Sequence, residues 1–200
     1  MTIIVMIDTE TTSLSPETGG CVHQIGILAK EVASDKTATS IIERCFYLPT
    51  LESHWDAVTL AWAKSHIPAA VEETLASAMI YQEVESMRQQ TLSVVEATIR
   101  ELKNYKKPIK VIFQHPEFDL PFLEEAGIDV RNILGYRNVH DLGSLILGYY
   151  AGRFSDTNSE RMVEALYRRT RGDHNALGDC RAQMQRLALI DYAGLHLSRS

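Results

Sequence analysis

The sequence has few cysteines, no long apolar run and no signal-peptide pattern, and each of these absences excludes a class of protein. Only three of its 200 residues are cysteine, and Cys21, Cys45 and Cys180 form neither a CxxC pair nor a cluster with zinc-ligand spacing. We therefore expect three reduced thiols, as in a cytosolic protein. No stretch approaches the roughly 20 apolar residues that span a bilayer, and the N-terminus lacks the basic and long apolar regions of a signal peptide. We expect a cytoplasmic protein with no membrane partner.

The sequence also lacks an excess of basic residues. Lys and Arg total 20 against 26 Asp and Glu, which gives a net charge of −6. Domains that bind nucleic acid mainly through a basic surface commonly have a pI above about 9, so this class is disfavoured. An acidic chain can still meet phosphate groups through bound metal ions. With 45% apolar and 23% charged residues, the composition is that of a folded globular protein.

The order of the expected elements indicates a single α/β domain over residues 1–200. Strands are expected at 2–7, 21–33, 39–48 and 109–113, the second and third paired antiparallel through a turn at Asp35 and Lys36. Helices are expected at 57–65, 68–79, 83–105, 116–126, 141–151, 158–170 and 175–193. Gly127 is expected to end the fourth helix, and a Thr157-x-x-Glu160 capping box to open the sixth. The apolar stripe of the longest helix comprises Val84, Met87, Leu92, Val95, Ile99 and Leu102.

Two carboxylates lie at the end of the first strand. Asp8 and Glu10 are two residues apart, so on a strand they project from the same face, about 7 Å apart. Like charges this close repel unless water or a cation lies between them. The pattern therefore indicates either a solvated strand end or a site for a divalent cation.

The second site is a third carboxylate, Asp119, which lies within an apolar part of the helix at 116–126. Its neighbours Phe118, Leu120 and Phe122 are core-forming residues. Burial of a carboxylate among such residues is costly unless the group is paired or ligated. The alternative is an exposed helical Asp119 with the two phenylalanines turned inward.

The third polar group opens the last helix. His174 precedes Asp179 by five residues, which on a continuous helix places them about 140° apart. Gly172 and Asp173 place His174 in the preceding loop or first turn, from which it can turn toward Asp179. A histidine there can take up a proton near neutral pH. The alternative is that His174 only helps to cap the helix.

Together these three groups resemble the DnaQ-like 3′→5′ exonuclease superfamily, in its DEDDh branch. The likeness rests on the start Asp8-Thr9-Glu10-Thr11-Thr12, the pair Phe118-Asp119 and the finish His174-Asn175-Ala176-Leu177-x-Asp179. Residues 55–62 are also similar to small bacterial and phage exoribonuclease-like proteins related to the RecE exonuclease. The sequence departs from the pattern at His115, where relatives often have Asn, and at Ser13, where many have Gly. These departures bear on substrate preference.

The resemblance implies a ribonuclease H-like mixed sheet with flanking helices. It also implies a 3′→5′ exonuclease that uses two divalent cations, Mg²⁺ or Mn²⁺, on single-stranded DNA or RNA 3′ ends and releases nucleoside 5′-monophosphates. The implied metal ligands are Asp8, Glu10, Asp119 and Asp179, and His174 is the implied general base. The candidate substrate contacts are Thr11, Thr12, Leu14, Trp62 and Phe118. Burial of Trp62 in a core is the alternative to base stacking, and a homodimer stays open.

Two other functions stay open at this stage. Asp8-Thr9-Glu10 after a strand faintly resembles the Asp-x-Asp motif of metal-dependent phosphatases, although Glu10 and the His174/Asp179 pair count against it. A nuclease-fold module that binds nucleic acid without catalysis is the other alternative. The presence of all five polar residues disfavours it.

Overall fold

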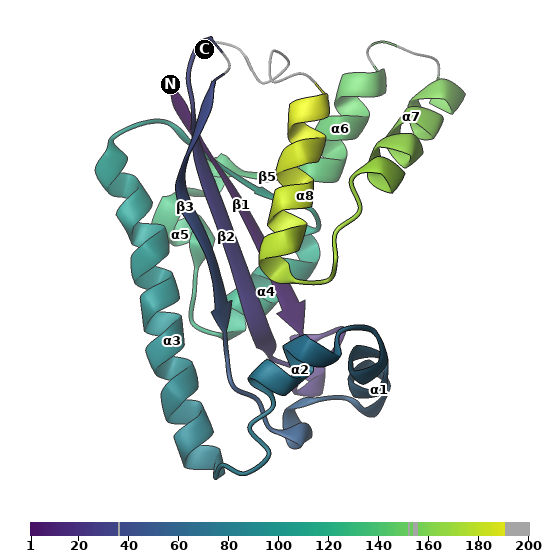
Figure 1. Ribbon diagram of the computed structural model, residues 1–200. Coiled ribbons are helices and arrows are strands. Elements are labelled where there is room, and N and C mark those ends of the chain that lie inside the picture. Colours follow the sequence, from purple (N-terminus) through teal and green to yellow (C-terminus); the bar gives the residue numbers. More distant parts are fainter. Residues whose placement is uncertain (36, 152, 154–155, 191–200) are drawn as a thin grey trace.

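The computed structural model describes residues 1–35, 37–151, 153 and 156–190 (Figure 1). Five strands among them form one mixed sheet in the order β3-β2-β1-β4-β5. β1 (Thr2–Thr11) pairs antiparallel with β2 (Val22–Val32), which pairs antiparallel with β3 (Ala38–Tyr47). On its other side β1 pairs parallel with β4 (Ile109–Phe113), which pairs parallel with β5 (Val139–Asp141). The expected α/β fold with a mixed sheet and flanking helices is confirmed.

The side chains of β1 divide between two cores. Ile3, Val5 and Ile7 pack in one core with α3 (Tyr81–Glu101), α4 (Pro116–Glu125) and α5 (Val130–Leu134). Ile4 and Met6 pack in the other with α6 (Leu142–Ala151), α7 (Asp156–Arg169) and α8 (Ala176–Leu189). A strand buried on both faces reads as a continuous apolar run, which explains the sequence before Asp8. The same alternation carries Asp8 and Glu10 to the α8 side, and Thr9 to the α4 side.

A small third core lies at the end of the sheet where β1 stops (Figure 1). It joins Trp55 to Ala63 of α1 (Ala57–His66) and Val71 of α2 (Pro68–Thr74). The amide of Asp56 donates to the carbonyl of Thr12 at 3.2 Å, and the Asp56 carboxylate caps α1. This contact ties the start of α1 to the residue that follows β1. Short 3-10 turns complete the chain at Pro16–Thr18, Glu52–His54, Leu102–Tyr105 and Tyr136–Asn138.

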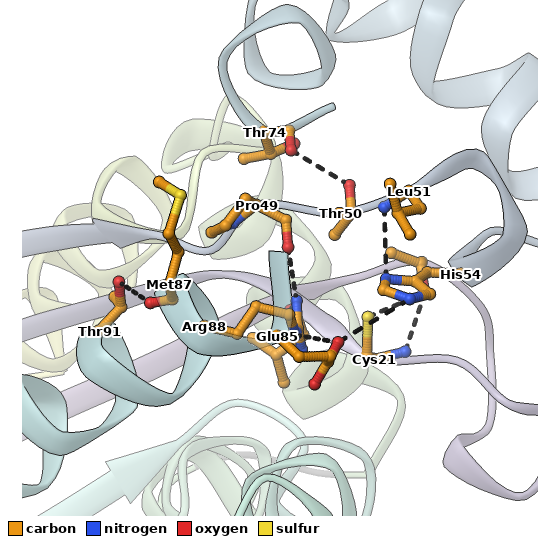
Figure 2. A network of polar contacts seen from close by, with 12 residues as sticks. Cys21, Pro49, Thr50, Leu51, His54, Thr74, Glu85, Met87, Arg88 and Thr91 are labelled. Atoms are coloured by element: carbon orange, nitrogen blue, oxygen red, sulfur yellow. Dashed lines mark hydrogen bonds and ion pairs between the residues drawn. The ribbon is translucent and has the colours of Figure 1, made fainter. Parts of the chain in front are cut away.

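α3 buries a charged residue instead of one apolar residue of its predicted stripe. Met87 is 45% exposed, whereas the next residue, Arg88, is only 5% exposed. The Arg88 Nη1 donates to the carbonyls of Val22 and Pro49, each at 3.1 Å, and Nε lies 3.6 Å from Glu85 (Figure 2). Buried backbone carbonyls need donors, and a long guanidinium supplies them here.

Several predicted boundaries are wrong. The helix predicted to end at 79 ends at Thr74, because the amide of Thr50 donates to its carbonyl and the amide of Ala76 donates back to Thr50. The five-residue α5 and three-residue β5 were not predicted, and both are too short to show a periodic pattern. α7 begins at Asp156, so Thr157 is not its N-cap. Lys36 of the predicted turn, the Thr157 side chain and residues 191–193 of the predicted last helix lie outside the described residues.

Among the described helices, none combines the length and the apolar character needed to cross a membrane. The three cysteines form no disulfide with one another; Cys180 is buried, and Cys21 and Cys45 are half-buried.

Candidate active site

Five of the polar residues singled out in the sequence line one cavity of about 360 Å³: Asp8, Glu10, Asp119, His174 and Asp179. The cavity lies at the carboxyl ends of β1 and β4, next to the start of α8. Because β1 and β4 are parallel, their carboxyl ends meet at the same edge of the sheet. Residues that are 171 positions apart in the sequence are thereby brought to one place.

A glycine brings α8 close to the sheet at this point. Gly26 of β2 is the pairing partner of Asp8 on β1. A Cβ atom at Gly26 would lie 2.3 Å from the backbone of Ala176, so only glycine lets the first turn of α8 approach so closely. The following turn of the helix then carries Asp179 toward Asp8 and Glu10.

The start of α8 is further held by polar contacts with β2 and β3. The N-cap residue Asn175 accepts from the amide of Gly178 at 3.2 Å. Its Nδ2 donates to Gln24 Oε1 and to the Tyr47 hydroxyl, both at 3.3 Å. The amide of Ala176 also donates to Gln24 Oε1. The helix cap is therefore Asn175, and His174 lies free of that role.

His174 lies in the loop before α8, as the sequence predicted, and adopts the left-handed conformation with φ of 58°. The loop is closely fitted to Asp179, because a Cβ atom at Gly172 would lie 1.4 Å from Asp179 Oδ1. Ligand atoms of Glu10, His174 and Asp179 all lie within 4.8 Å of one another. His174 is exposed, and its ring meets the edge of Trp62 at a centroid distance of 5.2 Å.

Asp119 reaches the site from the other side of β1. It is 4% exposed, so the alternative of a solvated helical residue is wrong. The amide and the hydroxyl of Thr9 donate to its Oδ1 at 3.0 and 2.7 Å. These bonds satisfy one carboxylate oxygen. Asp119 is thereby anchored to β1 close to Asp8, although the Asp8 side chain lies on the opposite face of the strand.

Burial and mutual repulsion disfavour the ionised carboxylates. Burial, followed by the charges of Asp119, Glu10 and Asp179, holds the pKa of Asp8 well above its usual range. Burial and the neighbouring Asp179 raise the pKa of Glu10 to about 8. Burial raises the pKa of Asp119 to about 6, although the hydrogen bonds from Thr9 act against it. Burial also raises the pKa of Asp179. A cation among these groups would relieve the repulsion.

The donor set fits a divalent cation with hard oxygen preference. Four carboxylates and the imidazoles of His115 and His174 line the cavity, and carboxylate oxygens suit Mg²⁺ or Mn²⁺. Among the described residues, Glu10, His174 and Asp179 form the one group of three or more acidic, His or Cys residues whose ligand atoms lie close enough together to hold a metal ion.

The cavity also contains three polar residues that sequence reasoning missed: Gln114, Gln183 and Arg186. Gln183 and Arg186 follow Asp179 by four and seven positions on α8, so they share its face. That spacing is the signal by which they could have been found. Gln183 Nε2 donates to Asp8 Oδ1 at 2.6 Å, and Arg186 donates to Gln114 Oε1.

The residues predicted to contact substrate differ in their position relative to the cavity. Phe118 lines the cavity, and Trp62 is 39% exposed beside His174. Leu14 is 83% exposed at the strand end. The hydroxyls of the two threonines are used within the chain: Thr11 donates to the carbonyl of Ser13, and the fully buried Thr12 accepts from the amide of Cys21. The structure does not bring these two hydroxyls into the cavity.

The sheet order, the flanking helices and the edge at which the cavity lies define an α/β domain with a ribonuclease H-like nuclease fold. A solved structure similar to this chain is the crystal structure of cell-death related nuclease 4 (CRN-4), with a TM-score of 0.53 and 14% sequence identity. The match covers 94% of this chain and 64% of that chain, so this chain spans less than two thirds of that nuclease. At this identity the likeness shows the fold alone. No family model and no curated protein matches the sequence.

Proposed function

We propose that the chain is a single metal-dependent 3′→5′ exonuclease domain of the DnaQ-like superfamily, in its DEDDh branch. It hydrolyses phosphodiester bonds at the 3′ end of single-stranded DNA or RNA and releases nucleoside 5′-monophosphates. Within this superfamily, the similarity of residues 55–62 relates the chain to the small bacterial and phage exoribonuclease-like proteins. The observation that carries the proposal is the convergence of Asp8, Glu10, Asp119 and Asp179 on one cavity, with His174 beside Glu10 and Asp179.

In this proposal Asp8, Glu10, Asp119 and Asp179 hold two divalent cations. Such cations, Mg²⁺ or Mn²⁺, neutralise charge on the scissile phosphate and favour deprotonation of the attacking water. Asp8 would contribute from within the carboxylate cluster, since the charges of the three other carboxylates all act on it. Thr9 orients Asp119 through two hydrogen bonds to one oxygen and leaves the other oxygen available.

His174 is the general base of the proposed mechanism. It lines the cavity and is exposed, and one of its ring nitrogens lies within 4.8 Å of ligand atoms of Glu10 and Asp179. From this position the imidazole can accept the proton of a water held between the carboxylates and the substrate. The edge contact with Trp62 limits the orientations of the ring.

Substrate contacts in this proposal come from the aromatic and apolar side chains around the cavity. Phe118 forms part of its wall, and Trp62 and Leu14 offer exposed surface for a base. Stacking of a base on an aromatic ring contributes about 1–3 kcal/mol in single-strand binding proteins. Thr11 and Thr12 contribute by fixing the turn after β1. Arg171, which also lines the cavity, supplies a cation for the phosphate backbone.

The test is digestion of matched single-stranded DNA and RNA oligonucleotides labelled at the 5′ end, with Mg²⁺ or Mn²⁺. We expect a ladder that shortens from the 3′ end and stops when the metal is chelated. Asp8→Asn and Asp179→Asn are expected to lower the rate at least 1,000-fold (roughly the loss of about 4 kcal/mol of transition-state stabilisation). Binding without cleavage under all metal conditions would instead indicate a module without catalysis. Release of phosphate from aryl phosphates without oligonucleotide cleavage would indicate a phosphatase.

A further inference from the structure

Gln183 is a buried amide at the edge of the carboxylate cluster to which the sequence assigns no role. It lies one helical turn after Asp179 on α8 and is 1% exposed. Its Nε2 donates to Asp8 Oδ1 at 2.6 Å, so it links α8 directly to β1. Gln183 also lines the candidate cavity.

The other half of this amide is unsatisfied. Gln183 Oε1 is fully buried and has no hydrogen-bond partner among the described residues. Buried polar side-chain atoms in folded proteins are nearly always hydrogen-bonded to protein or to ordered water. When Asp8 is ionised, as binding of a cation requires, an amide turned the other way would place its oxygen against the carboxylate, so Nε2 is the atom that belongs there. Among the described contacts, the hydrogen bond to Asp8 is therefore the one that fixes the amide.

A neutral donor suits this position for an electrostatic reason. A Lys or Arg that donated to Asp8 would place a positive charge where a cation has to bind. α8 does carry a cation on the same face, one turn further along, but Arg186 is engaged elsewhere. Its Nε and Nη2 donate to the hydroxyl and the carbonyl of Thr170, at 2.9 and 2.8 Å, and its third nitrogen donates to Gln114.

Thr9 and Gln183 thus have equivalent structural roles on the two faces of β1. Thr9 donates to one oxygen of Asp119, and Gln183 donates to one oxygen of Asp8. Each donor fixes the orientation of a carboxylate that is buried among like charges. Residues that orient metal ligands in this way commonly change metal affinity 10- to 100-fold when they are replaced.

We propose that Gln183 is a positioning residue of the metal site. Its Nε2 holds Asp8 in the orientation in which the carboxylate would bind a cation. This role rests on the proposed function, because it requires Asp8 to be a metal ligand.

The test measures Mn²⁺ binding to the full chain by electron paramagnetic resonance, in the absence of substrate. The variant is Gln183→Met, which keeps the length of the side chain and removes both the donor and the acceptor. We expect Mn²⁺ affinity to fall at least tenfold, while the unfolding midpoint without metal stays unchanged. Gln185→Met is the matched control, since Gln185 is exposed on the same helix. We expect it to bind Mn²⁺ like the unaltered chain.

The outcomes separate this role from the proposed function. If the unaltered chain binds no Mn²⁺, both fail. If it binds Mn²⁺ and Gln183→Met lowers the affinity less than tenfold, the proposed function stands and the role of Gln183 is refuted. If Gln183→Met does not fold, Gln183→Asn decides by the same criterion, because its shorter amide cannot reach Asp8. Undiminished binding by Asp8→Asn also overturns the role.

Discussion

The hydroxyl and the amide of Thr9 both donate to a single oxygen of Asp119, across 110 positions of sequence. The contact fixes a carboxylate of α4 against the backbone of β1. It also explains how a buried aspartate is tolerated among the phenylalanines of α4, because a carboxylate that accepts two hydrogen bonds is partly compensated for the loss of water.

Thr9→Val removes one of these two donors and keeps the shape of the side chain. A hydrogen bond to a charged group contributes about 1.5–3 kcal/mol, and Asp119 loses one such bond. We expect Mn²⁺ affinity and exonuclease rate to fall about 10- to 100-fold. Thr11→Val is the control, since its hydroxyl bonds only to the carbonyl of Ser13. Equal Mn²⁺ titrations of the two variants would contradict the prediction.

Gly172→Ala is expected to displace Asp179. The added methyl group would meet Asp179 Oδ1, so either the loop or the carboxylate must move. A misplacement of about 1 Å in a catalytic group can cost about 100-fold in rate, and we expect a loss of this order in kcat/KM. Because the loop is at the surface, the unfolding midpoint should change little. Gly148→Ala in α6 has open space around it and serves as the control.

The stability of the metal-free protein is expected to fall as pH rises from about 4.5 to about 8. The pKa of Glu10 is raised from 4.5 to about 8, so in this range the native state retains a proton that the unfolded chain has released. Each pKa unit corresponds to about 1.4 kcal/mol, and Glu10→Gln should flatten the profile. Urea unfolding in the presence of a chelator measures the free energy of unfolding across this pH range. Replacement of an exposed acid, Glu17→Gln, is the control. Greater stability near pH 8 than near pH 5 in the unaltered, metal-free chain would contradict it.

Arg88→Met is expected to destabilise the fold without altering the site. The carbonyls of Val22 and Pro49 would lose their buried donor, at about 1–3 kcal/mol for each unsatisfied group. Urea unfolding should show a clear loss, while kcat at a temperature where the variant is folded stays unchanged. Arg100→Met removes an exposed ion pair with Glu96 and should cost under about 1 kcal/mol. Similar losses in the two variants would refute the role of Arg88.

The strands of the sheet were predictable where their burial gives the sequence an alternating or a continuous run of apolar residues. The runs at 2–7 and 109–113 indicated buried strands, and the structure has strands there. β5 has three residues and no pattern of its own, so only its pairing with β4 defines it. The burial of Arg88 in place of Met87 was unpredictable for a related reason. It depends on two backbone carbonyls that come from other parts of the chain.

The candidate site was predictable only in part from spacing. The two-residue period placed Asp8 and Glu10 on one strand face. The association of Asp119 and Asp179 with them was indicated by the resemblance to an exonuclease superfamily and by no local pattern. Gln114 escaped notice because its contact with Arg186 joins the residue after β4 to the last turns of α8. Such contacts follow from helix packing, which a single sequence does not reveal.

The position of α8 has a consequence for the order in which the protein is made. Asp179 reaches its position only when the first turn of α8, at Ala176, packs against Gly26 and Gln24 of β2, in a sheet whose first strands were synthesised long before. Domains are synthesised from the N-terminus at about 5–20 residues per second. During translation the sheet can therefore begin to pair while the nascent chain still lacks one carboxylate and the histidine. Under the proposed function, a growing chain beside the messenger RNA stays inactive until this helix docks.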